Sequence, residues 1–200
     1  MKKMMMSLVL LLCSANLIMA GGVKVGDKVS NIKLKNIDGK MYSLEEQKSA
    51  KGFIVIFTCN HCPFSVKYED RIIALQNKYE KLGYPVVAIN PNDVKRVPED
   101  SFEEMIVRAR EKQFNFPYLY DETQAVASRF GAARTPHVFI LNKEKSGLMV
   151  KYIGAIDDNV ESAKEVNSAY VENAMDEILA GKVVTQSATK AIGCTIKWKE

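Results

Sequence analysis

Two cysteines separated by two residues are the side chains of this sequence best suited to chemistry. Cys59 and Cys62 stand within residues 58–63 (TCNHCP), directly after the apolar run 53–57. The run is typical of a buried strand, and apolar side chains recur at helical spacing after Pro63. A thiol between a strand and a helix start lies near free backbone N–H groups and the positive end of the helix dipole, which favour the thiolate. The pattern therefore predicts Cys59 as a nucleophile.

The spacing of the pair favours thiol–disulfide exchange. Cys62, expected one turn into the helix, is placed to attack a mixed disulfide formed on Cys59. His61 stands between them and adds positive charge when it is protonated. Thiols in such motifs reach pKa values of roughly 3.5 to 7, against about 8.5 for free cysteine. We therefore expect a redox-active disulfide between Cys59 and Cys62, with His61 assisting catalysis at Cys59.

Other uses of two cysteines fit the sequence less well. Structural zinc usually needs four ligands, and no second paired motif is present. Haem attachment requires a histidine directly after the second cysteine, where Pro63 stands. Copper(I) is an alternative, because thiolates suit this ion and His137 could complete a site. In the leading interpretation we expect no metal and no cofactor.

Composition indicates one globular domain with a sizeable core. The chain has 200 residues, of which 47% are hydrophobic and 26% charged. Its formal net charge of +4 is too small to indicate a nucleic-acid partner.

Residues 1–20 have the parts of a secretory signal peptide. Two lysines precede the apolar stretch 4–19, and Ala20 stands before two glycines. Polar residues interrupt this short span, so we expect no stable membrane anchor. The mature domain, residues 21–200, is then exported to the periplasm or secreted, where disulfides form and persist.

Export leaves an odd number of cysteines. Removing the signal removes Cys13 and leaves Cys59, Cys62 and Cys194. One thiol must then be unpaired or shared, and Cys194 is expected to be a buried or docked thiol.

A strand, a helix and a second strand must position the pair. The strands 53–57 and 85–90 flank a helix that follows Cys62 and ends at Gly83, which predicts a right-handed parallel crossover. Parallel strands end at the same edge of a sheet, so the loop 90–93 should lie beside Cys59. This loop is either a substrate rim or an ordinary turn.

Local patterns give the other elements. We expect a hairpin over 33–43 with its turn at Asp38-Gly39, a helix over 98–112 capped by Asp100 or Ser101, a strand over 117–120, a helix over 123–130, strands over 137–141 and 148–153, and a last helix ended by Gly181. Residues 182–200 lack periodicity, although the segment 193–198 is apolar enough to dock.

The cysteine motif after a strand, Thr135-Pro136 before a later strand and the final helix together resemble the thioredoxin fold. The N-terminal hairpin resembles the extended version of exported thiol–disulfide oxidoreductases and peroxiredoxins. A bacterial group of peroxiredoxin-like proteins (redoxins, related to AhpC/TSA) is similar in segments 57–63, 98–102, 116–119, 154–159 and 193–198. The resemblance implies an α/β, thioredoxin-like fold with a central mixed sheet flanked by helices and an N-terminal β-hairpin extension.

This resemblance also implies roles for individual residues. Pro136 should be cis and pack against the cysteines, and the backbone of Thr135 should hold a substrate strand. Disulfide isomerases and periplasmic oxidants likewise have a histidine before the second cysteine, which favours an oxidising pair. Thioredoxins carry a buried acid that takes protons from the second cysteine, where Phe53 stands here. No substitute is evident in the sequence, although Glu69, Asp70 or a water could serve.

The leading hypothesis is an exported thiol–disulfide oxidoreductase that exchanges disulfides with protein thiols and with a redox partner protein. A thiol peroxidase using Cys62 is the alternative. Peroxiredoxins have their peroxidatic cysteine there, but with threonine in place of Cys59 and an activating arginine where Thr135-Pro136 stands. We therefore expect slow reaction with peroxide. Copper chaperones of this fold place three residues, rather than two, between their cysteines.

Overall fold

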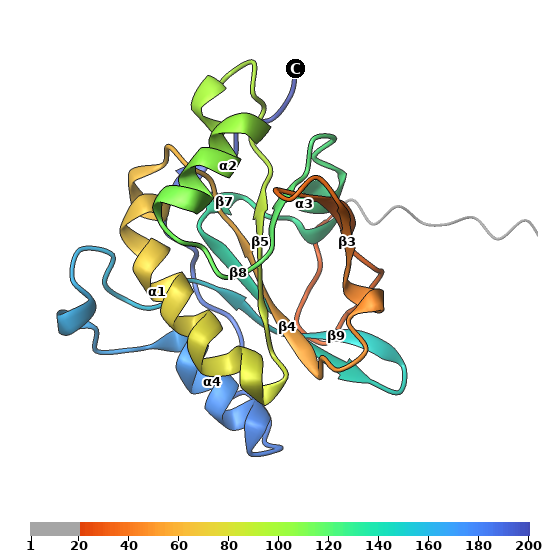
Figure 1. Cartoon of the computed structure of the whole chain (residues 1–200). Helices are drawn as coiled ribbons and strands as arrows, with labels where there is room; N and C mark the ends of the chain where they lie inside the picture. Colours follow the sequence, from red (N-terminus) through yellow and green to blue (C-terminus); the bar gives the residue numbers. More distant parts are fainter. Residues whose placement is uncertain (1–20) are drawn as a thin grey trace, which may run out of the picture.

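The computed structural model describes residues 21–200, so the predicted signal peptide, residues 1–20, lies outside the described residues. A mixed sheet forms the centre, with strand order β1-β9-β8-β4-β5-β6-β2-β3, and helices cover both of its faces (Figure 1). A separate two-stranded sheet pairs β10 with β7. No helix within residues 21–200 is long and apolar enough to cross a membrane.

The strands are β1 (Lys28–Val29), β2 (Lys33–Asn36), β3 (Met41–Ser43), β4 (Gly52–Phe57), β5 (Val86–Asn90), β6 (Tyr118–Tyr120), β7 (Arg134–Thr135), β8 (His137–Glu144), β9 (Gly147–Gly154) and β10 (Cys194–Thr195). The helices are α1 (Pro63–Tyr79), α2 (Phe102–Glu111), α3 (Ala125–Phe130) and α4 (Tyr170–Leu179), and the short 3-10 turns are η1 (Leu44–Glu46), η2 (Glu80–Leu82), η3 (Pro98–Asp100) and η4 (Ala163–Glu165).

Strand β4 is the spine of the sheet and is buried along its whole length. It pairs parallel with β5 and antiparallel with β8, with Phe57 opposite both Ile89 and His137. The predicted parallel pairing of these two strands is therefore confirmed. Because β8 runs in the opposite direction, its beginning lies where β4 and β5 end. One edge of the sheet thus gathers residues 58–62, 91–93 and 133–136.

Alternation along β4 supplies two apolar layers. Ile54 and Ile56 pack in a cluster with buried residues of α1, α2 and α4. Phe53, Val55 and Phe57 face the opposite cluster, which includes residues of α3. Figure 1 shows α1 beside α4 on one side of the sheet. Burial on both faces explains why β4 reads as a continuous apolar run.

The predicted N-terminal hairpin is confirmed and belongs to the main sheet. Strands β2 and β3 pair antiparallel, and Gly39 in their connection has a φ of 81°. Strand β2 also pairs with β6, so the hairpin closes one edge of the sheet. The strands expected over 137–141 and 148–153 are longer than predicted, because β8 continues to Glu144 and β9 begins at Gly147.

The predicted helix over 98–112 is interrupted at its start. The 3-10 turn η3 ends at Asp100, and Ser101 then adopts an extended conformation before α2. The Oγ of Ser101 accepts a hydrogen bond from the backbone N–H of Glu104 at 3.3 Å. Ser101 is therefore the cap, and the carboxylate of Asp100 is left for contacts elsewhere.

The C-terminal residues dock, as expected. Strand β10 pairs antiparallel with β7, with Cys194 opposite Thr135. Ile196 is buried in the cluster on the α3 side of the sheet. Figure 1 shows the C-terminus close to the end of the fold that carries α2.

Candidate redox site

Cys62 stands at a different position relative to the helix from the one that the sequence suggested. Helix α1 begins at Pro63, and Cys62 is its N-cap residue. The expectation that Cys62 lies one turn into the helix is therefore wrong. Proline suits the first helical position, where no intrahelical N–H bond is needed. The helix N-terminus consequently faces Cys62 more closely than Cys59.

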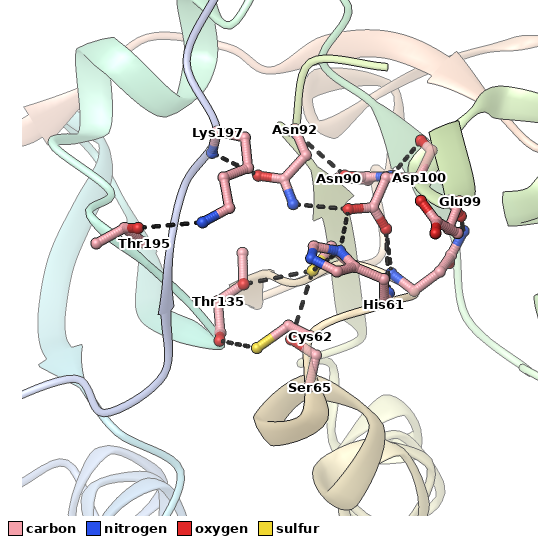
Figure 2. A network of polar contacts seen from close by, with 12 residues as sticks. His61, Cys62, Ser65, Asn90, Asn92, Glu99, Asp100, Thr135, Thr195 and Lys197 are labelled. Carbon is pink, nitrogen blue, oxygen red and sulfur yellow. Dashed lines mark hydrogen bonds and ion pairs between the residues drawn. The ribbon is translucent and has the colours of Figure 1, made fainter. Parts of the chain in front are cut away.

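Thr135 contacts both sulfurs from a distant part of the chain. The Sγ of Cys59 lies 3.4 Å from the Thr135 hydroxyl, and the Cys62 thiol donates to the Thr135 carbonyl oxygen at 3.2 Å (Figure 2). Both cysteines are free thiols in this structure. The Thr135–Pro136 peptide bond is cis, which confirms that expectation. The structure thus brings together the five residues predicted for the site at Cys59, His61, Cys62, Thr135 and Pro136, with the His61 Nδ1 3.9 Å from the Cys59 Sγ.

Asp100 is central to the site, although the sequence indicated it only as a possible helix cap. Its side chain is fully buried. One oxygen accepts the backbone N–H groups of Asn60 at 2.7 Å and His61 at 3.2 Å. The other accepts the Asn92 amide at 2.7 Å and the His61 Nδ1–H at 2.7 Å (Figure 2). Four donors therefore satisfy this buried carboxylate.

These hydrogen bonds change the electrostatics expected for Cys59. The N–H groups of Asn60 and His61 serve Asp100 rather than a thiolate. The pKa of Cys59 is raised by its hydrogen bond to the Cys62 thiol, by burial and by the Asp100 carboxylate. The prediction that Cys59 is the low-pKa thiol of the resting pair is therefore wrong, because a carboxylate occupies the donors that it needed.

Cys62 carries the stabilised negative charge instead. Its hydrogen bond with the Cys59 thiol is the main cause that lowers the pKa of Cys62 to about 4, against the opposing effect of burial. The thiol and N–H of Cys194 and the N–H of Ser65 add further donors. The two cysteines thus share one proton. The contact of Cys62 with the Thr135 carbonyl needs an S–H group, so it belongs to the protonated form.

His61 is paired rather than acting as an isolated charge. Its Nδ1 donates to Asp100, because a carboxylate only accepts, and the same atom lies 3.9 Å from the Cys59 Sγ. The Nδ1 is therefore not a base for the Cys59 thiol. When the imidazole is protonated, the adjacent Asp100 carboxylate balances its charge.

The side chains that could hold a metal differ from those the sequence suggested. In residues 21–200, the ligand atoms of Cys59, His61 and Asp100 lie within 4.8 Å of one another. His137 is not in this group. Its Nδ1 accepts the Ala133 N–H at 3.3 Å, and burial lowers its pKa to about 4.

The alternative acids for proton transfer lie elsewhere. Glu69 is buried, and Arg108 donates to both of its oxygens, at 2.7 and 2.9 Å. Asp70 is exposed on the same helix. Asp100 is the carboxylate that acts on Cys59. Its place just before α2 gave no sign of this role, because Asp100 and Ser101 are equally good helix caps in sequence.

The loop 90–93 lies beside the cysteines, as predicted, but it is not an open rim. The Asn92 side chain accepts the Lys197 N–H at 2.9 Å, and the Asp93 N–H donates to the Lys197 carbonyl at 2.9 Å. The C-terminal residues therefore cover this loop. Cys59 is 3% exposed and Cys62 is completely buried.

Comparisons with known proteins identify the family of this chain. Residues 25–166 match the model of the AhpC/TSA family. The chain belongs to that family. A comparison with curated proteins gave no significant match.

Solved structures extend the similarity over most of the chain. An uncharacterized conserved protein from Geobacillus kaustophilus is 38% identical, with a TM-score of 0.80 over 88% of this chain and 93% of that chain. A hypothetical protein from Sinorhizobium meliloti 1021 is 33% identical, with a TM-score of 0.81 over 90% of this chain and 97% of that chain.

More distant neighbours confirm the predicted thioredoxin-like fold class. Peroxidoxin BcpB from Mycobacterium tuberculosis has a TM-score of 0.54 at 19% identity, over 78% of this chain and 94% of that chain. At this identity the likeness concerns the fold alone. Membership of the AhpC/TSA family supports a thiol-based redox function for this chain.

We predict that the reduced protein keeps a thiolate far below neutral pH. The ultraviolet absorbance of thiolate should titrate with a midpoint near the pKa of about 4 of Cys62. Cys62→Ser should abolish this transition. Cys59→Ser should keep it at a somewhat higher pH, because one donor is replaced. A low-pH transition that survives in Cys62→Ser would place the charge on another sulfur.

A second prediction concerns Asp100. In a Cys62→Ser background, Asp100→Asn should move the pH of half-maximal Cys59 alkylation downward, because it removes the nearby negative charge that raises this pKa. The asparagine oxygen can still accept the two backbone N–H groups. Glu99→Gln removes the same charge from an exposed neighbour and is the matched control. Equal pH profiles for the two variants would refute the role of Asp100.

Proposed function

We propose that this protein is an exported thiol–disulfide oxidoreductase that uses a Cys59–Cys62 disulfide to oxidise protein thiols. The observation that carries the proposal is the set of donors around Cys62. A sulfur at a helix N-cap, with a pKa lowered to about 4, is a good leaving group in disulfide exchange. The same donors stabilise the reduced pair, which favours an oxidising disulfide.

The proposed exchange begins with a substrate thiolate. It attacks the Cys59 sulfur, the Cys59–Cys62 bond breaks, and Cys62 leaves as the stabilised thiolate. A mixed disulfide now joins the substrate to Cys59. A second substrate thiolate attacks the substrate sulfur of that bond and releases a substrate disulfide and the Cys59 thiolate, which takes up a proton. The substrate has lost two electrons, and the cysteine pair has gained them.

The neighbouring residues support this division of roles. The Thr135 hydroxyl, 3.4 Å from Cys59, can donate to that sulfur when it departs as a thiolate. The His61–Asp100 pair holds the connection between the two cysteines through the 2.7 Å contact. Cys62 resolves the mixed disulfide in the reverse direction, when its thiolate attacks Cys59.

Location and partners are part of the proposal. Residues 1–20 support export to the periplasm or outside the cell, where a disulfide can persist. An enzyme that oxidises one thiol after another must be reoxidised, so a redox partner protein completes the cycle. No nucleic acid and no stable membrane anchor is involved.

Disulfide trapping tests the central claim. Acid quenching and peptide mapping of protein from an oxidising compartment should find Cys59 joined to Cys62. With oxidised glutathione, Cys62→Ser should accumulate a glutathione adduct on Cys59, because the resolving sulfur is absent. Free Cys59 and Cys62 thiols in protein from the oxidising compartment would exclude the proposed disulfide.

A thiol peroxidase using Cys62 is the second candidate. The lowered pKa of Cys62 and the family favour it. Against it, the Arg134 side chain donates to the Gly193 carbonyl at 3.2 Å rather than facing Cys62, and Cys59 replaces the expected threonine. The first proposal therefore ranks higher.

Stopped-flow oxidation separates the two functions. We expect hydrogen peroxide to oxidise the reduced protein slowly, at the rate of an ordinary thiolate, because Arg134 is held by the C-terminal residues. Cys62→Ser and Cys59→Ser should identify the reacting sulfur. Oxidation at peroxiredoxin-like rates, retained in Cys59→Ser and lost in Cys62→Ser, would make the peroxidase the main function.

A further inference from the structure

The tail segment, defined as residues 193–199, is bound along the cysteine site by backbone contacts. Cys194 pairs with Thr135, the residue that touches both catalytic sulfurs. Further along, the Lys197 N–H donates to Asn92, and the Lys199 N–H donates to the Gln124 side chain at 2.7 Å. Figure 2 shows this segment passing Thr135 and reaching Asn92 through Lys197. The segment is therefore held at several points on either side of Cys194.

Gly193 fits the segment closely against the site. A Cβ atom at this position would lie 2.1 Å from the Thr135 carbonyl oxygen, a distance that no side chain tolerates. The Arg134 guanidinium also donates to the Gly193 carbonyl at 3.2 Å. This close approach fixes the strand next to the residue that carries the third thiol.

Cys194 faces Cys62. Both the thiol and the backbone N–H of Cys194 act on the Cys62 sulfur as donors. The carbonyl opposite Cys194, that of Thr135, also accepts from the Cys62 thiol at 3.2 Å. The register of β10 thus places Cys194 opposite Thr135, the residue whose carbonyl Cys62 contacts, and from there its thiol acts on the Cys62 sulfur.

Solvent access distinguishes Cys194 from the other two cysteines. Cys59 and Cys62 are buried, with exposures of 3% and 0%. Cys194 is half-buried. Among the cysteines of residues 21–200, it is the one that an external thiol meets first.

The geometry points to Cys194 as a redox relay that carries the disulfide from the buried pair to the surface, an inference that rests on the proposed function. In the exchange proposed above an external thiolate attacks Cys59; here the Cys194 thiolate attacks Cys62 in the Cys59–Cys62 disulfide instead, because Cys194 lies beside Cys62. That bond breaks, a Cys62–Cys194 bond forms, and Cys59 leaves as a thiolate that takes up the proton given by Cys194. One disulfide exists before and after the step. A substrate thiolate then attacks Cys194, and Cys62 leaves.

The charges around Cys194 favour its attack after the Cys59–Cys62 disulfide has formed. Burial and the nearby Cys62 raise the pKa of Cys194 to about 11, whereas Lys197 and Arg134 oppose the rise. Once Cys62 is part of a disulfide it bears no negative charge, and its contribution disappears. Lys197 and Arg134 remain. Cys194 is therefore a better nucleophile when the disulfide that it attacks is present.

Trapping tests the contact between the two sulfurs. Oxidised glutathione added to Cys59→Ser should produce a Cys62–Cys194 disulfide, identified by peptide mapping. The matched control combines Cys59→Ser, Cys194→Ser and Thr195→Cys. It keeps a thiol in the tail segment but moves it to the opposite face of the strand, because successive side chains alternate. This control should form no intramolecular disulfide.

Exchange kinetics test the relay itself. In the otherwise unchanged protein, reduction of the Cys59–Cys62 disulfide by glutathione should be about fivefold or more slower in Cys194→Ser, because the accessible sulfur is lost. Thr195→Ala, an exposed change on the same strand, should leave the rate unchanged. Gly193→Ala should reduce Cys62–Cys194 trapping in the Cys59→Ser background and leave Cys59–Cys62 formation intact in the otherwise unchanged protein, because it displaces the tail segment.

The outcomes separate the relay from the function on which it rests. The relay alone is overturned if Cys59→Ser yields only free thiols or glutathione adducts at Cys62 and Cys194, or if Cys194→Ser exchanges as fast as the unchanged protein. Absence of a Cys59–Cys62 disulfide in both the unchanged protein and Cys194→Ser overturns the relay and the proposed function together.

Discussion

The buried carboxylate of Asp100 holds the redox site together. Its donors come from the connection after β4, at Asn60 and His61, and from the loop after β5, at Asn92. An unpaired carboxylate in the interior would cost several kcal/mol, so all of these groups are fixed at once. Asp100 thus fixes the backbone between the two cysteines, although it lies 39 to 40 residues further along the chain than His61 and Asn60.

The same carboxylate adds to an inequality between the two sulfurs. The hydrogen bond with Cys62, burial and Asp100 disfavour a negative charge on Cys59, whereas the Cys59 thiol, nearby donors and the helix N-terminus favour one on Cys62. For an external thiolate, this inequality favours attack on Cys59 and departure of Cys62. Thr135 then contributes at both positions, with its hydroxyl toward Cys59 and its carbonyl toward Cys62. The chemical direction of the pair thus follows from its surroundings more than from the motif itself.

The sequence was sufficient for the elements that position the site. The apolar run before Cys59 and the helical spacing after Pro63 predicted β4 and α1, and the resemblance located Thr135-Pro136. Local signals could not assign Asp100, because aspartate and serine both cap helices and the turn of the chain decides between them. Neither could they find β10, since a strand of two residues has no measurable alternation. The sequence also could not show which cysteine has the lowered pKa, because this depends on contacts between segments that are distant along the chain.

Burial of Cys59 and Cys62 also affects how easily these residues are damaged by oxidation. A cysteine is lost irreversibly when its sulfenic acid meets further oxidant and becomes a sulfinic or sulfonic acid. Here both sulfurs are buried, with exposures of 3% and 0%, β10 pairs with Thr135 beside them, and each has another thiol as a neighbour. A sulfenic acid formed at this buried pair condenses with its neighbour to a disulfide, which is reversible. Burial beside the docked C-terminus therefore preserves the working life of the dithiol.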